Sequence, residues 1–258
     1  MREMQSLDEV ARAVRDCADC PLHRGRTHAV PGEGSPSAEL MFIGEGPGFH
    51  EDRQGRPFVG PAGHLLEGLL ASIGTNREDV FIANMVKCRP PDNRDPEPSE
   101  ITACGKYLDR QIELINPKLI VTLGRFSLGR FFPGESVTRA RGKLRQKDGR
   151  HIFPVLHPAA ALRRPELRKT LVEDFRAIAS ILEADALPDP PTEPAAAPPK
   201  EPPAGQLDIF GVPATPPPHI SFPLEGEGRD GGGAGDPADG PAPESPGHHD
   251  GPQQLTLL

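Results

Sequence analysis

Residues 39–48 have the sequence ELMFIGEGPG, in which a short apolar run passes into a loop containing three glycines. Such a run is typical of a strand buried on both faces, as the strands of a parallel sheet are. Glycines at positions 44, 46 and 48 let the backbone pass close to a ligand and expose amide N–H groups. An ordinary glycine-rich turn has the same composition, so this loop alone indicates only a candidate site.

Strands and helices are predicted to alternate along residues 1–187. Similar apolar runs occur at residues 79–84 (DVFIAN), 118–124 (KLIVTLG) and 151–156 (HIFPVL). Helical spacing of apolar residues is found at 7–15, 61–73, 99–115 and 166–182, and a short helix is expected up to Phe132. Ser99 is the expected N-cap of the helix at 99–115. This alternation predicts an α/β fold of three αβα layers around a central, mostly parallel sheet of four strands.

Residues 188–258 differ from the rest in composition. They hold 18 of the 33 prolines, a run of three glycines, and no Cys, Tyr or Met. Burial of so few apolar residues cannot offset the entropy cost of ordering the backbone. We therefore expect one folded domain at 1–187 followed by a disordered tail. The tail has a net charge of −9, which leaves residues 1–187 with 27 basic and 26 acidic residues. The formal net charge of −8 therefore does not argue against DNA binding by the domain.

The four cysteines, Cys17, Cys20, Cys88 and Cys104, require an explanation other than disulfides. The N-terminus lacks the apolar stretch of a signal peptide, and no apolar run approaches the ~20 residues that span a bilayer. We therefore expect a cytoplasmic protein with no membrane partner, where disulfides are uncommon. Four thiolates in one site suit a zinc ion or an iron–sulfur cluster, and unligated buried cysteines are a further alternative.

Polar or aromatic side chains follow the predicted strands. Glu45, Glu51 and Phe58 come after the first strand, Asn84 ends the second, and His157 follows the fourth. Because ligands of parallel sheets bind beyond the carboxyl ends of the strands, we expect these side chains to meet at one edge. Taken singly, each has an ordinary alternative, such as a core Phe, a turn-capping Asn or a structural His.

The order of the motifs is more specific than any single motif. GEGPG (44–48), GRPFVGPAG (55–63), NMVKCRPP (84–91), the four cysteines and HPAAALR (157–163) closely resemble the iron–sulfur, or family 4, uracil-DNA glycosylases. The resemblance covers about residues 17–182 and implies a [4Fe-4S] cluster on the four cysteines. Two related families are disfavoured. The family that traps its product covalently has a basic loop with a reactive His, which residues 90–100 lack, and the family with a broader base range has a different first motif.

This resemblance implies a monofunctional DNA-repair enzyme that flips uracil out of single- or double-stranded DNA and hydrolyses its N-glycosidic bond. The product is an abasic site, and flipping costs a few kcal/mol. Uracil would stack on Phe58, be read by the amide of Asn84 and lie against the backbone at Gly46. His157 would donate a hydrogen bond to uracil O2, where negative charge develops. The alternative is a non-catalytic DNA-binding module with the same fold and cluster.

The resemblance leaves two candidates for the carboxylate of the implied mechanism, Glu45 and Glu51. Gly46 stands where the best-known uracil glycosylases have a catalytic Asp. Glu45 or Glu51 would therefore stabilise the sugar cation or orient water, and Glu51 could instead exclude the 5-methyl group of thymine.

The resemblance also suggests DNA contacts and a structural role for the cluster. Leu162 or Arg163 would fill the gap left by the flipped base, and Arg139 and Lys143, in the basic run 139–145, would hold phosphates. The cluster would join the N-terminal segment to residues 88–104, in a protein that we expect to be a monomer.

One apolar island stands out in the tail. Gln206, Leu207, Asp208, Ile209 and Phe210 resemble the short peptide by which bacterial repair and replication proteins dock on the sliding clamp. Leu207, Ile209 and Phe210 would fill an apolar pocket while the Gln206 amide fixes the orientation. A chance match is the alternative, and residues 253–258 (QQLTLL) are a weaker second candidate.

Overall fold

The structure is a computed structural model that describes residues 4–184 and residue 187. The chain divides into two units, Met1–Pro199 and Lys200–Leu258, and only the first contains described residues. The tail predicted at 188–258 and the clamp-like peptide at 206–210 lie outside the described residues, so both stay predictions.

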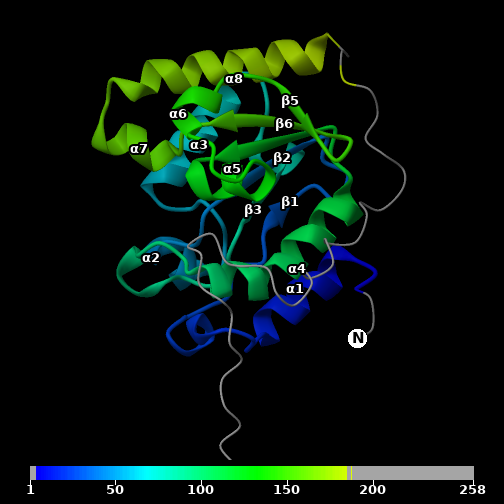
Figure 1. The fold of residues 1–258 in the computed structure, drawn as a ribbon, viewed down its shortest axis with the longest axis vertical. Helices are drawn as coiled ribbons and strands as arrows, with labels where there is room; N and C mark the ends of the chain where they lie inside the picture. The colour runs from blue at the N-terminus through cyan, green and yellow to red at the C-terminus, as the bar shows by residue number, and fades with distance from the viewer. Residues whose placement is uncertain (1–3, 185–186, 188–258) are drawn as a thin grey trace, which may run out of the picture. The chain divides into compact units, whose positions relative to one another are not determined.

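A mixed sheet of six strands forms the centre of the first unit (Figure 1). In spatial order, these are β1 (Glu33–Gly34), β3 (Phe81–Asn84), β2 (Leu40–Gly44), β4 (Leu119–Leu123), β6 (Arg150–Val155) and β5 (Arg145–Lys147). The four inner strands are parallel, and they are the four that the sequence predicted. The α/β class is therefore confirmed, whereas the expected strand number is wrong by two. Both additional strands pair antiparallel at the edges, and they are too short and polar to show an apolar run.

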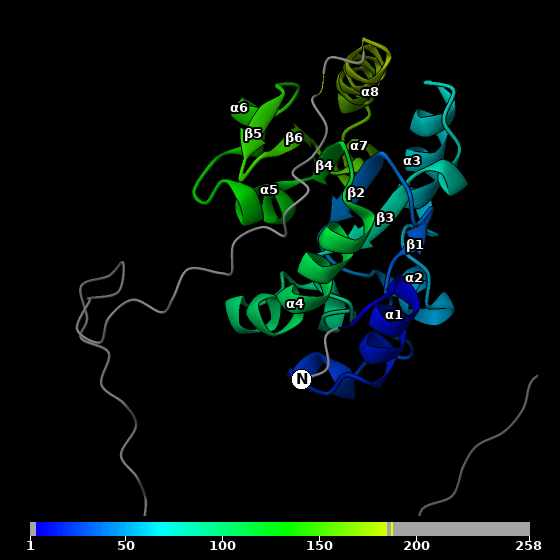
Figure 2. The same cartoon turned by 90° about the vertical axis from the view of Figure 1, so that its right-hand side faces the viewer.

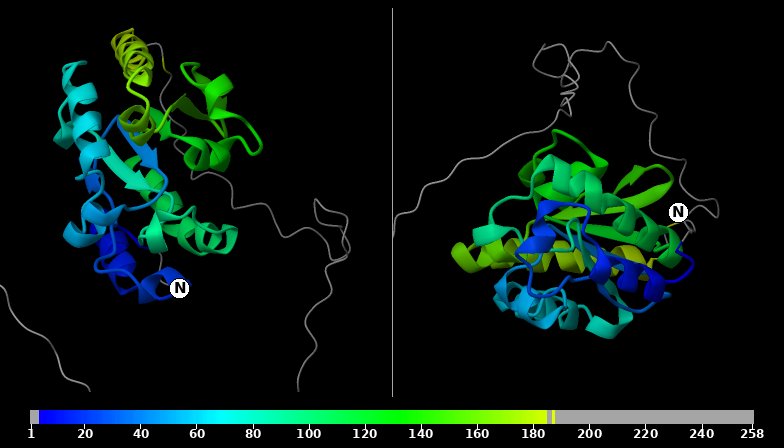
Figure 3. Two further views of the ribbon diagram at one scale, coloured as in Figure 1. Left: turned by 90° about the vertical axis from the view of Figure 1, so that its left-hand side faces the viewer. Right: turned by 90° about the horizontal axis from the view of Figure 1, so that it is seen from below.

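Helices cover both faces of the sheet (Figures 1 and 2). On one face, Phe42, Val121 and Phe153 pack against α3 (Pro61–Ala71) and α8 (Leu167–Glu183). On the other, Met41, Ile43, Ile120 and Ile152 pack against α4 (Pro98–Ile115). α1 (Leu7–Asp16) lies beside α4 and shares a smaller apolar cluster with it (Figure 3). This alternation along each strand follows from the two-residue period of side chains in a sheet.

Several short helices were not predicted. They are α2 (Phe49–Gln54), α6 (Val137–Ala140), α7 (Pro158–Arg163) and the 3₁₀ turns Pro21–Arg24, Arg77–Asp79 and Pro91–Asn93. None completes two full helical turns, so no apolar period could reveal them. The predicted short helix before Phe132 is α5 (Arg125–Phe131).

The N-cap predicted for α4 is wrong. The helix begins at Pro98, and Glu97 rather than Ser99 is the cap. The Glu100 carboxylate accepts a hydrogen bond from the Glu97 backbone N–H at 2.8 Å, while the Glu97 side chain accepts one from the third helical residue. This reciprocal capping box, with proline in the first turn, supplies the start signal that Ser99 was expected to give.

Within the described part of the chain, no helix is both long and apolar enough to cross a membrane.

Candidate functional site

The motifs after β2, β3 and β6 meet at the carboxyl edge of the sheet. Gly44 and Asn84 are register partners at the ends of β2 and β3. A Cβ atom on Gly44 would lie 2.4 Å from Asn84 Oδ1 and 2.7 Å from the Phe58 ring, so only glycine allows these side chains so close. His157 follows β6, and its ring centroid lies 5.6 Å from that of Phe58. Asn84, Phe58 and His157 thus surround one small space.

Phe58 is held in a backbone conformation that few phenylalanines adopt. Its φ is 51°, and the residue is 5% exposed. Arg77 Nη1 donates to the Phe58 carbonyl at 2.9 Å, and Arg77 Nε donates to Glu33 Oε1 at 3.0 Å. Gly63 packs directly against the Phe58 backbone, where a Cβ atom would lie 1.9 Å from the carbonyl oxygen. Strain that surrounding contacts hold in place is typical of functional positions.

Asn84 presents an unpaired acceptor to this space. The residue is 2% exposed, and its Oδ1 atom has no hydrogen-bond partner among the described residues. A buried acceptor without a partner is costly, so its presence suggests a ligand that donates a hydrogen bond. The Asn84 backbone carbonyl accepts a hydrogen bond from Lys87 Nζ at 3.0 Å, which fixes the end of the strand.

His157 is the N-cap of α7, and this position defines its tautomer. Its Nδ1 atom accepts a hydrogen bond from the backbone N–H of Ala159 at 3.1 Å. In a neutral ring, the proton therefore lies on Nε2, which is left as a donor. The pKa of His157 is lowered to about 4, chiefly by burial and also by the nearby Arg163 charge, while the Glu51 charge acts in the opposite direction. The ring is thus a neutral hydrogen-bond donor near pH 7.

The two candidate carboxylates have different environments. Glu51 Oε1 accepts hydrogen bonds from the backbone N–H groups of Val59 at 3.0 Å and Gly60 at 2.9 Å, directly after Phe58. Glu51 thereby anchors the turn that carries the aromatic ring. Burial raises the pKa of Glu45, nearby Asp95 adds to the rise, and two arginine charges oppose it. Glu45 therefore differs from Glu51 in two ways: its pKa is raised, and no such hydrogen bonds from the backbone hold its carboxylate among the described residues.

The predicted DNA contacts lie on two elements. Arg139 and Lys143 line an open hollow beside α6, together with Arg145. Leu162, which is 39% exposed, and the exposed Arg163 lie at the end of α7, the helix that His157 begins.

Arg141 does not line this hollow, and two arginines of the basic run are held by other side chains. Arg141 forms an ion pair with the buried Asp174 at 2.6 Å, and Arg145 pairs with Glu135 and lies over Phe132 at 3.8 Å. These two arginines thus have structural partners.

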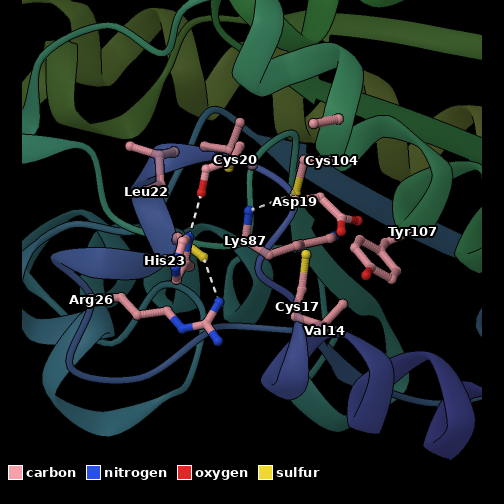
Figure 4. A pocket seen from close by; sticks show the side chains of 13 residues that line it. Val14, Cys17, Asp19, Cys20, Leu22, His23, Arg26, Lys87, Cys104 and Tyr107 are labelled. Atoms are coloured by element: carbon pink, nitrogen blue, oxygen red, sulfur yellow. Dashed lines mark hydrogen bonds between the residues drawn. The ribbon is translucent and has the colours of Figure 1, made fainter. Parts of the chain in front are cut away.

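The four cysteines line a single cavity (Figure 4). Cys17 caps the end of α1, Cys20 precedes the turn at 21–24, Cys88 follows β3, and Cys104 lies in α4. Cys88 and Cys104 are buried, and Cys17 and Cys20 are partly exposed. The apolar part of its lining is formed by Val14, Leu22, Val86 and Tyr107, and the polar residues Asp19, His23 and Arg26 also border it.

Four thiols that line one cavity are a donor set that suits either a zinc ion or an iron–sulfur cluster. Burial raises the pKa of Cys88, and that of Cys104 to about 11, so bare thiolates would be unfavourable here. Arg26 Nη1 lies 3.2 Å from Cys88 Sγ and the Lys87 backbone N–H lies 3.2 Å from Cys104 Sγ, both as donors.

Sequence reasoning missed three residues in or near these two regions. Arg77 holds the Phe58 backbone, and nothing in its local sequence indicated that role. Lys87 is 1% exposed, and its place between Asn84 and Cys88 in NMVKCRPP was the available signal. Phe49 is 51% exposed directly after the glycine loop, where an apolar residue without helical periodicity could have been noticed.

Comparisons with known proteins identify the family to which the chain belongs. The family model described as "Uracil DNA glycosylase superfamily" matches residues 31–179. The type-4 uracil-DNA glycosylase of Sulfurisphaera tokodaii is 55% identical over 185 residues, which cover 68% of this chain and 84% of the relative. The type-4 enzyme of Saccharolobus solfataricus is 53% identical, with 69% of this chain and 88% of the relative covered. That of Archaeoglobus fulgidus is 46% identical, with 69% and 94% covered. The chain belongs to the uracil DNA glycosylase superfamily and, within it, to the type-4 family.

Proposed function

We propose that this chain is a DNA-repair hydrolase that excises uracil from DNA and leaves an abasic site. The observation that carries the proposal is the unpaired Asn84 Oδ1 atom beside the Phe58 ring. Uracil N3–H supplies the missing donor, and uracil O4 accepts from the Asn84 side-chain N–H₂ group. Cytosine has a bare N3 and an amino group at these places, so it leaves polar groups mispaired, which discriminates more strongly than shape.

The rings of Phe58 and His157 restrict how the base enters. Their centroids are 5.6 Å apart, which is less than the ~7 Å that a base stacked between two rings would need. We infer that uracil stacks on the part of Phe58 that His157 leaves uncovered. It then meets the histidine at its edge, where Nε2–H points to uracil O2.

In the proposed reaction, the bond between C1′ and uracil N1 breaks and its electron pair goes to the base. The neutral His157 ring donates a hydrogen bond to O2, where the negative charge gathers. One such donor is worth ~3–4 kcal/mol elsewhere. A water oxygen then bonds to C1′. Glu45 orients this water, takes up its proton and stabilises the positive sugar, while Glu51 holds the Phe58 turn and the Gly46 backbone borders the base.

Cys17, Cys20, Cys88 and Cys104 would hold a [4Fe-4S] cluster. When bound, it supplies four iron–thiolate bonds that join the N-terminal segment to β3 and α4. Hydrolysis transfers no electrons, so the role inferred for these ligands is structural. Anaerobically purified protein is expected to be brown, to absorb broadly near ~400 nm and to contain equal iron and sulfide. Zinc in their place would contradict the cluster.

For DNA, Arg139 and Lys143 are proposed to hold phosphates, and Leu162 and Arg163 to fill the space that the flipped nucleotide leaves. The peptide at 206–210 is proposed to dock on the sliding clamp. A labelled peptide of residues 201–215 should bind a bacterial clamp with a Kd below ~100 μM, about −5.5 kcal/mol. A peptide carrying Gln206→Ala and Phe210→Ala should not.

The direct test of the enzyme uses an end-labelled oligonucleotide with one uracil, followed by alkali to cut abasic sites. Cutting at uracil, but not at cytosine or thymine in matched oligonucleotides, is expected. Binding of the uracil strand without release of the base would instead indicate a non-catalytic module.

A further inference from the structure

Phe49 is an exposed aromatic residue with two arginines over its ring. It begins α2 and is 51% exposed, more than any other large apolar residue in the described part of the chain. The guanidinium carbon of Arg89 lies 5.4 Å from the ring centroid, and that of Arg53 lies 6.0 Å away. The His50 ring meets Phe49 edge-on at 5.5 Å.

This group lies beside the candidate active site. The glycine loop before Phe49 packs on the segment after Asn84, because the Val86 N–H donates to the Glu45 carbonyl at 3.1 Å. Arg89 comes from that same segment and is held by Asn93 Oδ1 at 2.8 Å. On the other side, a Cβ atom on Gly60 would lie 3.2 Å from the His50 ring, next to the Phe58 turn.

The chemistry of the group fits a nucleobase and its phosphates. An aromatic face binds any base by stacking, and guanidinium groups over the ring add cation–π attraction and charge for the backbone. The two arginines do not bury the ring, because Phe49 remains 51% exposed. In the proposed function a base is flipped out beside this group, so the neighbouring base of a single strand loses one stacking partner.

We propose that Phe49, Arg53 and Arg89 form a stacking platform for the base adjacent to the flipped uracil. The inference rests on the proposed function for the position of the uracil. In a duplex, the neighbouring base remains paired and stacked on its own strand. The platform should therefore act mainly on single-stranded substrates, and it gives the protein a means of working on them.

Two substitutions at the same position test the platform. Phe49→Leu keeps an apolar side chain without a π face, and Phe49→Trp keeps the π face. On single-stranded uracil DNA, Phe49→Leu should raise KM about tenfold with kcat within about twofold, while Phe49→Trp stays near wild type. On the duplex, KM should change less than about threefold.

A binding measurement reports on stacking without chemistry. The single strand carries a 2′-fluorinated uracil nucleotide that resists cleavage and a fluorescent 2-aminopurine on its 5′ or 3′ side. Wild type and Phe49→Trp should quench the fluorescence at one of the two sides, and Phe49→Leu should not.

Equal quenching by Phe49→Leu, or a loss of kcat that is the same on both substrates, would overturn the platform. If the wild type released no uracil, the proposed function would fail, and the quenching comparison would still decide about the platform.

Discussion

The candidate active site and the cysteine cavity share one short segment of the chain, but the hydrogen bonding of their polar atoms differs. Asn84 and Cys88 are four residues apart after β3. At the active site, an amide oxygen is buried without a partner and a histidine N–H is left to donate. In the cavity, Cys88 and Cys104 each accept a hydrogen bond, and both line the same space as Cys17 and Cys20. The unpaired groups of the candidate active site suit a substrate that binds and dissociates, whereas the cysteine cavity suits a permanently bound cofactor.

Removing a thiolate should therefore have the largest effect. Cys88→Ala is expected to abolish absorption near ~400 nm and to yield insoluble protein. A structural metal site can contribute ~10 kcal/mol or more, as much as the whole stability of a domain. Soluble yield, absorption and thermal melting measure this. Soluble Cys88→Ala protein that melts like wild type would mean that the cavity is not a structural centre.

The opposite pattern is expected at the active site. His157→Ala should slow single-turnover uracil release about 100-fold because one donor to the departing base is lost. Asn84→Ala should slow it at least tenfold, since uracil loses its polar partner. Both variants should keep the ~400 nm absorption of the wild type. A loss of colour in either variant would show that the two regions are not separable in this way.

The sequence predicted the parts of the fold that repeat a local pattern. The four inner strands contain continuous apolar runs and the long helices have apolar residues at helical spacing, whereas β1 and β5 are identified only by their pairing with a neighbouring strand. Within the site, motif order pointed to Asn84, Phe58 and His157. It could not reveal Arg77, whose bond to the Phe58 carbonyl joins residues 19 apart, or the bond that gives Glu51 its anchoring role. Such contacts exist only once the chain is folded.

Lys87 forms hydrogen bonds to both regions, so its replacement tests whether the cavity influences the active site. Its buried ammonium group donates to the Asn84 carbonyl at 3.0 Å and to Gln111 Oε1 at 2.7 Å, and its backbone N–H donates to Cys104 Sγ. Lys87→Met keeps the length of the side chain but leaves the Asn84 carbonyl without this donor. We expect uracil release to slow five- to tenfold and stability to fall by about 2 kcal/mol.

The matched control for that variant is Lys106→Met. Lys106 also lies near the cavity, where it pairs with Asp19, but its side chain is 39% exposed. Its replacement should leave the rate of uracil release within about twofold of wild type. Equal rates for Lys87→Met and wild type would mean that the cavity does not influence the position of Asn84.

The smallest expected effect is that of pH on catalysis through His157. Burial lowers its folded pKa to about 4, so the ring is already neutral at pH 6 and protonation does not change between pH 6 and 8. The single-turnover rate should then vary less than about twofold over this range.

The pH dependence of stability is different, because the unfolded ring, with a pKa of ~6.5, binds a proton at pH values where the folded ring stays neutral. The folded state thus loses stability as the pH falls from ~6.5 towards 4, and keeps it above ~6.5.

A loss of rate at acid pH should come instead from Glu45, whose raised pKa means that it protonates above the usual range for a carboxyl group. Glu45→Gln should lower the plateau and remove that loss of rate, measured on a pH series at constant ionic strength. The contradicting result would be a wild-type rate that falls as the pH is raised from 6 to 7.5, with no such fall in His157→Gln. The active form of His157 would then be the charged imidazolium, and the neutral-donor mechanism would be wrong.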